Sequence, residues 1–233
     1  MERSRHGVRR LLDSRDGGVL SRSDRSETSE SSRTVKTGTT AIGVSAADGV
    51  VLATDKRASL GGEFVANKNV QKVLQVHPRA AMTLVGSVGD AQSFTKLMQA
   101  ETKYFELRRG DPLDIAALQR FVAKMIREVG GRRIHPLVAG IDEDGPRLAS
   151  VDGAGGLLTD DFIATGSGME LAYGVLEDQY EEGLSMSAAT DLAVETVRSA
   201  VERDTASGNG LHVATITNDG VDVTGYDAFE NAP

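Results

Sequence analysis

Within Lys36-Thr37-Gly38-Thr39-Thr40-Ala41-Ile42-Gly43 the composition of the chain changes from polar to strand-like, and this junction marks where the folded part begins. Residues 1–38 are rich in Ser, Arg, Asp and Gly and carry only a short apolar patch around Val8, Leu11 and Leu12. Such a composition buries too little apolar surface to offset the entropy of ordering, so we expect residues 1–38 to be mostly disordered. Short apolar segments typical of β-strands begin within the stretch and continue after it.

The sequence from Thr39 onward alternates runs of strands with pairs of helices. Apolar segments bounded by turn residues predict strands at Thr39–Val44, Val50–Thr54, Val70–Val76, Ala81–Val85, Leu137–Ile141, Arg147–Val151, Phe162–Thr165, His212–Thr217 and Val221–Thr224. Amphipathic stretches predict helices at Asp90–Arg108, Pro112–Val129, Met169–Glu181 and Ser185–Arg203, with Asp111 as the N-cap of the second. Because tight turns join neighbouring strands, an α+β fold is favoured over a parallel βαβ sheet. Two sheets packed face to face, with a helix pair on each outer face, give a four-layer αββα sandwich.

The composition excludes several classes of function. The 233 residues contain no cysteine, so a disulfide, a thiolate zinc site and a cysteine nucleophile are excluded. The four histidines are scattered, and we expect neither a metal nor a cofactor. Residues 1–38 carry a net charge of +3 and residues 39–233 a net charge of −11, and so acidic a body argues against a nucleic-acid partner. No apolar run approaches the roughly 20 residues that span a bilayer, so we expect a cytoplasmic protein with no membrane partner.

Acidic residues are abundant and lysines are few. The chain holds 34 Asp and Glu, and only 7 of its 26 basic residues are Lys. A protein from a high-salt cytoplasm often has this composition, and an ordinary solvated acidic face has it too. Activity and stability that fall as salt rises would contradict the high-salt hypothesis.

Two short motifs are predicted to be turns rather than binding loops. Gly153-Ala154-Gly155-Gly156 lacks the spacing and the strand-to-helix context of a dinucleotide-binding loop. Asp142-Glu143-Asp144-Gly145 lacks the later ligands of a calcium loop and lies between two predicted strands, which favours a hairpin turn.

Thr39 is the candidate nucleophile of the junction. A threonine hydroxyl needs a base, and one solution is the residue's own α-amino group, which becomes free when the bond after Gly38 is cut. Because Gly38 has no side chain, that bond can be approached closely and bent toward the Thr39 hydroxyl. A free α-amine has an unperturbed pKa of about 7.7–8, close to what a general base needs at neutral pH. The alternative is that Thr39 is only a β-branched strand residue.

Seven motifs occur in order along the chain, and their combination is specific. They are Gly38-Thr39-Thr40, Ala53-Thr54-Asp55-Lys56-Arg57, Asn69-Val70-Gln71-Lys72-Val73, Gly86-Ser87-Val88-Gly89-Asp90-Ala91-Gln92, Thr165-Gly166-Ser167-Gly168, Tyr173-Gly174-Val175-Leu176-Glu177 and Arg203-Asp204-Thr205-Ala206-Ser207-Gly208. In these motifs residues 38–233 resemble the catalytic β-type subunits of the proteasome, above all the archaeal ones. The resemblance implies the N-terminal nucleophile hydrolase fold for residues 39–233. It also implies that residues 1–38 are a propeptide removed by autolysis.

The resemblance further implies the roles of the central residues. Thr39 is implied to be the nucleophile, and the bond between Gly38 and Thr39 the one that cleaves itself. The Lys72 ammonium is implied to lower the proton affinity of the threonine hydroxyl and amine. Asp55 is implied to hold that lysine charged and oriented. The alternative for Asp55 and Lys72 is a surface ion pair of little energetic consequence.

Four further residues complete the implied machinery. The backbone N–H of Gly86 is implied to donate a hydrogen bond in the oxyanion hole. Ser167, Asp204 and Ser207 are implied to be accessory residues near the Thr39 amine. The alternatives are that Ser167 caps the following helix and that Asp204 has a structural role at a helix end.

By the same resemblance, Ala58, Leu84 and Val88 line the pocket for the side chain before the scissile bond. All three are apolar and small to medium in size, with no charge to pair with an acidic or basic side chain. We therefore expect cleavage after bulky apolar residues. Faster hydrolysis after acidic or basic residues would contradict this expectation.

The resemblance thus implies a threonine-type endopeptidase that matures from a zymogen and degrades unfolded proteins. The implied partners are other β subunits in heptameric rings, rings of proteasome α subunits and an ATP-dependent unfoldase. A closed ring encloses the sites, which limits access to a protease that cuts any unfolded chain. Peptide cleavage by the rings needs no cofactor.

Three other functions stay open. A catalytically silent subunit of the same assembly is expected to have lost Thr39, Asp55 or Lys72, but all three are present. The related bacterial protease with a hexameric ring also begins with Thr-Thr, but the segment Asp204-Thr205-Ala206-Ser207 disfavours it. A small-molecule amidase of the same superfamily is the third, and a panel of peptide and amide substrates would distinguish it.

Overall fold

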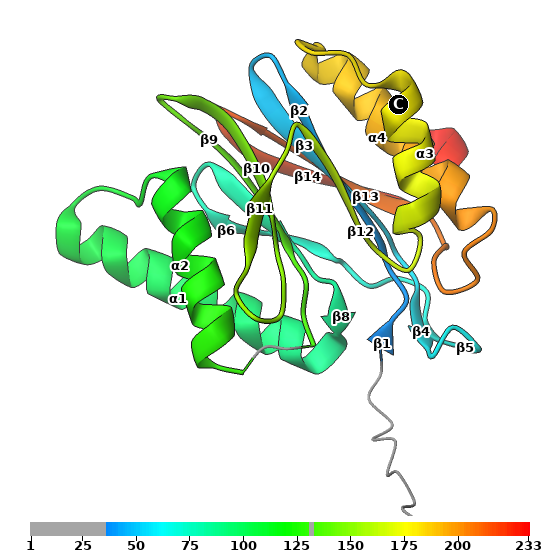
Figure 1. Ribbon diagram of the computed structural model, residues 1–233, viewed down its shortest axis with the longest axis horizontal. Helices are drawn as coiled ribbons and strands as arrows, with labels where there is room; N and C mark the ends of the chain where they lie inside the picture. Colours follow the sequence, from blue (N-terminus) through cyan, green and yellow to red (C-terminus); the bar gives the residue numbers. More distant parts are fainter. Residues whose placement is uncertain (1–35, 131–132) are drawn as a thin grey trace, which may run out of the picture. The chain divides into compact units, whose positions relative to one another are not determined.

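The computed structural model in Figure 1 describes residues 36–130 and 133–233. The predictions that residues 1–35 are disordered and belong to a removed propeptide concern residues outside this part of the chain. Within the described residues, no helix combines the length and the apolar character that crossing a membrane requires.

One five-stranded antiparallel sheet begins directly after the junction. Its strand order is β12-β2-β3-β13-β14. The strands are β2 (Thr40–Ala46), β3 (Gly49–Asp55), β12 (Phe162–Gly166), β13 (Leu211–Thr217) and β14 (Gly220–Tyr226). Because β3 is the central strand, Asp55 at its end lies between β2 and β13, directly opposite Leu211.

The second five-stranded sheet is also antiparallel, with the order β11-β10-β9-β7-β6. Its strands are β6 (Val73–His77), β7 (Ala80–Thr83), β9 (Leu137–Asp142), β10 (Gly145–Val151) and β11 (Leu157–Thr159). The predicted hairpin turn at Asp142–Gly145 joins β9 to β10, and the predicted turn at residues 153–156 lies between β10 and β11.

Apolar residues pack in three layers between the elements. The cluster between the two sheets draws on both of them. Helices α1 (Val88–Arg109) and α2 (Ile115–Glu128) cover the outer face of the second sheet, and α3 (Met169–Gln179) and α4 (Met186–Val201) cover the first (Figure 1). Central strand β3 is buried along its length, because Val51 packs with the α3–α4 layer while Leu52 packs against the other sheet. The predicted four-layer αββα sandwich is confirmed.

Helix α2 starts later than predicted, and α3 starts at Met169 as predicted but without the Ser167 cap that was considered for it. Helix α2 begins at Ile115 rather than Pro112, and Asp114 caps it by accepting a hydrogen bond from the Ala117 N–H at 2.6 Å. The prediction of Asp111 as the cap was wrong, because Asp142 of β9 accepts from the Ile115 N–H at 3.1 Å and supports the later start. At α3 the N-cap residue is Gly168, and no side chain makes a capping bond.

Several short elements have too few residues to show a periodic pattern and were not predicted. They are β1 (Lys36–Thr37), β8 (Gly86–Ser87), β4 (Ala58–Leu60), β5 (Phe64–Asn67), the edge strand β11 of the second sheet, and a 3-10 turn at Phe229–Asn231. Strand β1 pairs with β8, and β4 pairs with β5. Two of these, β4 and β8, flank the junction and contribute to the site.

Candidate active site

Thr39 lies just before β2, and hydrogen bonds of its backbone hold it in place. Its N–H donates to Ser167 Oγ at 3.2 Å, and its carbonyl oxygen accepts from the Ser167 N–H at 2.8 Å. The side chain is fully buried, and Thr39 Oγ1 has no hydrogen-bond partner within the described part of the chain. Because this buried hydroxyl makes no hydrogen bond to another described group, it is available to react with the adjoining peptide bond.

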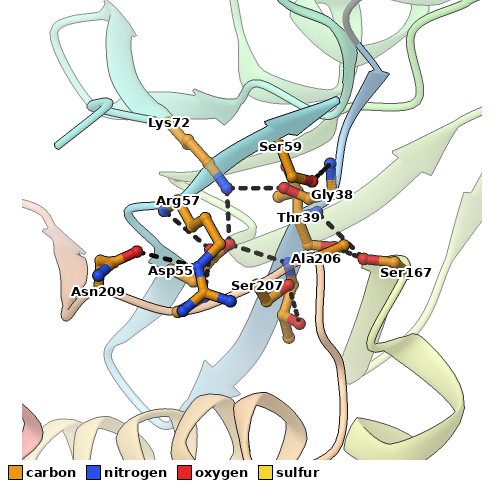
Figure 2. A network of polar contacts seen from close by, with 12 residues as sticks. Gly38, Thr39, Asp55, Arg57, Ser59, Lys72, Ser167, Ala206, Ser207 and Asn209 are labelled. Carbon is orange, nitrogen blue, oxygen red and sulfur yellow. Dashed lines mark hydrogen bonds and ion pairs between the residues drawn. The ribbon is translucent and has the colours of Figure 1, made fainter. Parts of the chain in front are cut away.

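Lys72 and Asp55 form a buried ion pair beside this bond. Lys72 Nζ lies 2.7 Å from Asp55 Oδ1, and both side chains are fully buried. The same ammonium donates to the carbonyl oxygen of Gly38 at 3.0 Å (Figure 2). The alternative of a surface ion pair is therefore wrong for these two residues.

Backbone donors from three segments converge on Asp55. Its Oδ1 accepts from the Thr40 N–H at 3.0 Å, and its Oδ2 accepts from the N–H groups of Arg57 at 3.0 Å and Gly208 at 2.8 Å. With the Lys72 ammonium, these donors fix both carboxylate oxygens. Asp55 therefore connects the junction, the end of β3 and the loop after α4.

Burial lowers the pKa of Lys72 below its usual value of 10.5. The charges of Asp55 and Asp204 oppose this shift, and the Arg57 charge adds to it. Removing the ammonium from water disfavours its charged form, whereas a bonded carboxylate favours it. Lys72 is thereby brought closer to giving up a proton than a lysine in water.

Ser167, Asp204 and Ser207 meet on the other side of Thr39. The two serine hydroxyls both donate to Asp204 Oδ2 at 2.6 Å. Ser207 Oγ also lies 3.0 Å from Thr40 Oγ1. The structure thus brings the three accessory residues together, and only Ser167 among them bonds Thr39 directly. Its hydroxyl makes these bonds instead of capping α3.

Gly86 lies in β8 opposite Thr37, two residues before the candidate nucleophile. Its backbone has φ = +111°, a conformation that favours glycine. A Cβ at this position would overlap the carbonyl oxygen of Arg133. Both the conformation and the close contact require glycine at this position.

The three residues of the predicted pocket lie in segments that adjoin the site. Ala58 begins β4, Val88 begins α1, and the Leu84 N–H donates to the Lys72 carbonyl oxygen at 2.6 Å. Ala58 and Leu84 are buried and Val88 is half-buried. Leu84 packs with the apolar cluster beneath α1 and α2.

Several contacts of the site could not be found from sequence patterns. The Gly38 N–H donates to Ser59 Oγ at 3.3 Å. Arg57 Nε donates to Asn209 Oδ1 at 2.9 Å, and Arg57 Nη1 donates to the Thr205 carbonyl oxygen at 2.8 Å. Arg57 stands in the same motif as Asp55, which is the only signal that pointed to it. Ser59 lies in the short strand β4, which gave none.

The site is built from carboxylates, hydroxyls, one ammonium and backbone groups. In the part of the chain that the structure describes, no three or more histidine and acidic side chains are grouped so that they could hold a metal ion.

Comparison with known proteins places the chain in a family. The model of the proteasome subunit family matches residues 35–216. A proteasome subunit beta from Halomicrobium mukohataei is 56% identical over 84% of this chain and 83% of its own length. The proteasome subunits beta 2 of Haloterrigena turkmenica and Haloarcula marismortui are each 54% identical, over 84% and 85% of this chain and 82% and 86% of their own lengths. The chain therefore belongs to the proteasome subunit family, among its β subunits.

Proposed function

We propose that this chain is a threonine-type endopeptidase of a proteasome core particle, with Thr39 as its nucleophile. One observation carries the proposal. The buried Lys72 ammonium bonds both Asp55 and the carbonyl oxygen of Gly38, while the adjoining Thr39 hydroxyl is buried and makes no other bond within the described residues. A cation on the carbonyl of the peptide bond that precedes an unengaged hydroxyl favours addition of that hydroxyl to the carbonyl carbon.

Maturation would proceed by an acyl shift followed by hydrolysis. Thr39 Oγ1 adds to the Gly38 carbonyl carbon, its proton leaves for a nearby base, and the Gly86 N–H is the proposed donor to the resulting oxyanion. The bond from the Gly38 carbonyl carbon to the Thr39 nitrogen then breaks, and the nitrogen takes up a proton. This step frees the Thr39 amine, and water then hydrolyses the ester that remains, which releases the Gly38 carboxylic acid and restores the Thr39 hydroxyl. The two steps of maturation together consume one water molecule.

Peptide cleavage would repeat the chemistry with the new amine as the base. Thr39 Oγ1 adds to the substrate carbonyl carbon while the α-amine accepts its proton, and that proton then passes to the leaving amine. Water hydrolyses the acyl-enzyme. The Ser167 hydroxyl, fixed by Asp204, already contacts the Thr39 nitrogen and would orient the free amine.

The family supports the wider setting of this activity. We propose β-subunit rings stacked on α-subunit rings, cytoplasmic assembly, an ATP-dependent unfoldase as the supplier of unfolded chains, and residues 1–38 as the propeptide. Ala58, Leu84 and Val88 are the proposed wall for the substrate side chain. Because none of the three is charged, we expect faster cleavage after leucine or tyrosine than after acidic or basic residues.

The test is intact-mass analysis of the purified wild type and of Thr39→Ala, with peptide hydrolysis as the second readout. The wild type should begin at Thr39, whereas Thr39→Ala should keep residues 1–38 and hydrolyse nothing. Thr159→Ala is the matched control, because Thr159 is an exposed residue of β11. A Thr39→Ala chain that is processed and active would refute the proposal.

A further inference from the structure

Gly38 is fixed on three sides. Its N–H donates to Ser59 Oγ at 3.3 Å, and its carbonyl oxygen accepts from Lys72 Nζ at 3.0 Å. On the third side its α-carbon faces Ala206, as Figure 2 shows. A Cβ built on residue 38 would overlap the Ala206 Cβ and would lie 2.6 Å from the Ala206 carbonyl oxygen and 2.7 Å from its Cα.

The neighbours of Gly38 in the chain cannot relieve this contact. Thr37 is held in register with Gly86 by the pairing of β1 with β8. Thr39 is bonded at its nitrogen and its carbonyl oxygen to Ser167. Because both flanking residues are fixed, a side chain added at position 38 has to point at Ala206.

The loop that carries Ala206 cannot retreat freely either. The Ala206 N–H donates to Asp204 Oδ1 at 3.1 Å, and the preceding carbonyl, that of Thr205, is held by Arg57. Two residues later the Gly208 N–H donates to Asp55. Ala206 itself is 7% exposed. Moving this loop away would break contacts that orient the ion pair of the site.

We propose that Ala206 determines the specificity of self-cleavage by restricting the residue before Thr39 to glycine. This inference rests on the proposed function and adds the residue that imposes the restriction. A side chain at position 38 pushes either the Gly38 carbonyl away from Lys72 or the Ala206 loop away from Asp55. Either shift slows the addition of Thr39 Oγ1 to the carbonyl carbon, since overpacking of a tight contact forces such displacements.

The restriction belongs to the precursor and not to peptide substrates. Residue 38 is covalently joined to Thr39, so the fixed backbone of Thr39 forces it into the space beside Ala206. A peptide substrate has no bond to the Thr39 nitrogen, so the residue before its scissile bond is not held by that constraint. Glycine is therefore required for maturation by a contact that need not set the preference for substrates.

The experiment follows processing of the full chain over time by intact mass. Gly38→Ala should slow the release of residues 1–38 by about tenfold to hundredfold, as expected when overpacking must be relieved before reaction. Combining Gly38→Ala with Ala206→Gly removes the shortest of the three contacts and leaves those to the carbonyl oxygen and Cα of residue 206, so processing should recover in part, by about the few-fold factor that one methyl contact is worth. The matched control combines Gly38→Ala with Ala154→Gly, an alanine exposed in the turn between β10 and β11, and should stay as slow as Gly38→Ala alone.

Two further measurements keep the result interpretable. Thermal unfolding of each variant shows whether a slow chain is folded. A chain whose residues 1–38 are replaced by a removable fusion that leaves Thr39 first reports peptide hydrolysis without self-cleavage. If that chain is inactive, the proposed function fails and this inference fails with it. If that chain is active, Gly38→Ala processed at the wild-type rate, or Ala206→Gly giving no recovery in a folded chain, overturns the role of Ala206 alone.

Discussion

Lys72 Nζ and Asp55 Oδ1 are 2.7 Å apart in an environment where neither side chain has any exposed surface. Taking two charges out of water is costly, and their attraction compensates only when other donors satisfy the carboxylate. Asp55 receives three backbone N–H groups in addition to the ammonium. The pair is therefore stable as a unit and costly to divide.

Asp55→Asn should destabilise the fold by about 3–5 kcal/mol near neutral pH, because it leaves a buried ammonium without its counter-charge. The pKa of Lys72 is already lowered by burial and falls further without Asp55. Between that lowered pKa and 10.5 the unfolded chain binds more protons, so stability rises with pH and part of the loss is recovered. Urea unfolding at neutral and alkaline pH measures both effects.

The control for that variant is the exposed pair of Lys124 and Glu128, whose charged atoms are 3.7 Å apart. Lys124→Ala should change the free energy of unfolding by under about 0.5 kcal/mol, since solvent screens such pairs. An Asp55→Asn chain as stable as Lys124→Ala would contradict the assignment of a buried charge pair.

Ser167→Ala should slow peptide hydrolysis more than Ser207→Ala. Both hydroxyls donate to Asp204, but only Ser167 bonds the Thr39 nitrogen, which is the proposed base after maturation. We expect a fall in kcat of about tenfold to hundredfold for Ser167→Ala, in the range of a lost contact to a general base. Steady-state kinetics on chains that begin at Thr39 make the comparison. Equal losses for the two serines would indicate that they act only through Asp204.

Two substitutions of Asn209 distinguish the contribution of its backbone conformation to stability from that of its side-chain hydrogen bond. It is the one described residue other than glycine with a positive φ, at 66°, and its Oδ1 accepts from Arg57. Asn209→Gly loses the bond but keeps the conformation, whereas Asn209→Ala loses the bond and strains the backbone by about 1 kcal/mol more. Unfolding in urea should therefore rank the chains as wild type, then Asn209→Gly, then Asn209→Ala. A reversed order of the two variants would contradict this account of the loop.

His77 should make the fold less stable in mild acid. Burial lowers the pKa of His77 below 6.5, the Arg79 charge lowers it further, and Glu106 and a backbone contact with Leu113 oppose the shift. Its Nδ1 also accepts from the Arg79 N–H at 3.1 Å, which requires a neutral ring nitrogen. As pH falls below 6.5, the unfolded chain takes up a proton before the folded one, so stability is lost.

The measurement is the difference in unfolding free energy between about pH 7.5 and pH 5.5, which brackets the unperturbed histidine pKa. His77→Gln should reduce that difference, and His135→Gln is the control because His135 is exposed. If both variants keep the wild-type difference, other groups are responsible for the acid sensitivity.

The sequence predicted the layers better than the contacts of the site. The β2–β3 hairpin and the amphipathic helices follow local patterns, so their positions could be found from spacing alone. Asp55 ends β3, and Lys72, 17 positions later, comes just before β6 of the other sheet, so no local pattern indicates that they meet. Their assignment came from the family resemblance.

For a related reason, the contacts made by the short elements could not be predicted from the sequence. Ser59 contacts Gly38 only because β4, a strand of three residues, pairs with β5. The α2 start depends on Asp142 of a distant strand, so a local rule that favours Asp111 before Pro112 gave the wrong residue. Tertiary packing decides such details, and a single sequence does not display it.

Gly166→Ala and Gly174→Ala make the same chemical change with opposite expected effects. Gly166 precedes Ser167, has φ = +97°, and an added Cβ would overlap the Thr39 carbonyl oxygen. Gly174 lies within α3, and apart from its chain neighbours and the backbone of its own helix no atom would lie within 4 Å of an added Cβ. Gly174→Ala should stabilise the fold by about 0.5–1 kcal/mol, because alanine favours a helix interior.

Gly166→Ala should instead destabilise the fold and stop processing, since the contact that it disturbs fixes Thr39 beside Ser167. Thermal unfolding and intact mass on the two variants test the pair together. Because both variants add one methyl group to the same αββα scaffold, their difference isolates the backbone requirement at Thr39, the proposed nucleophile. A Gly166→Ala chain that is processed at the wild-type rate would show that Thr39 does not need the carbonyl contact seen beside Gly166.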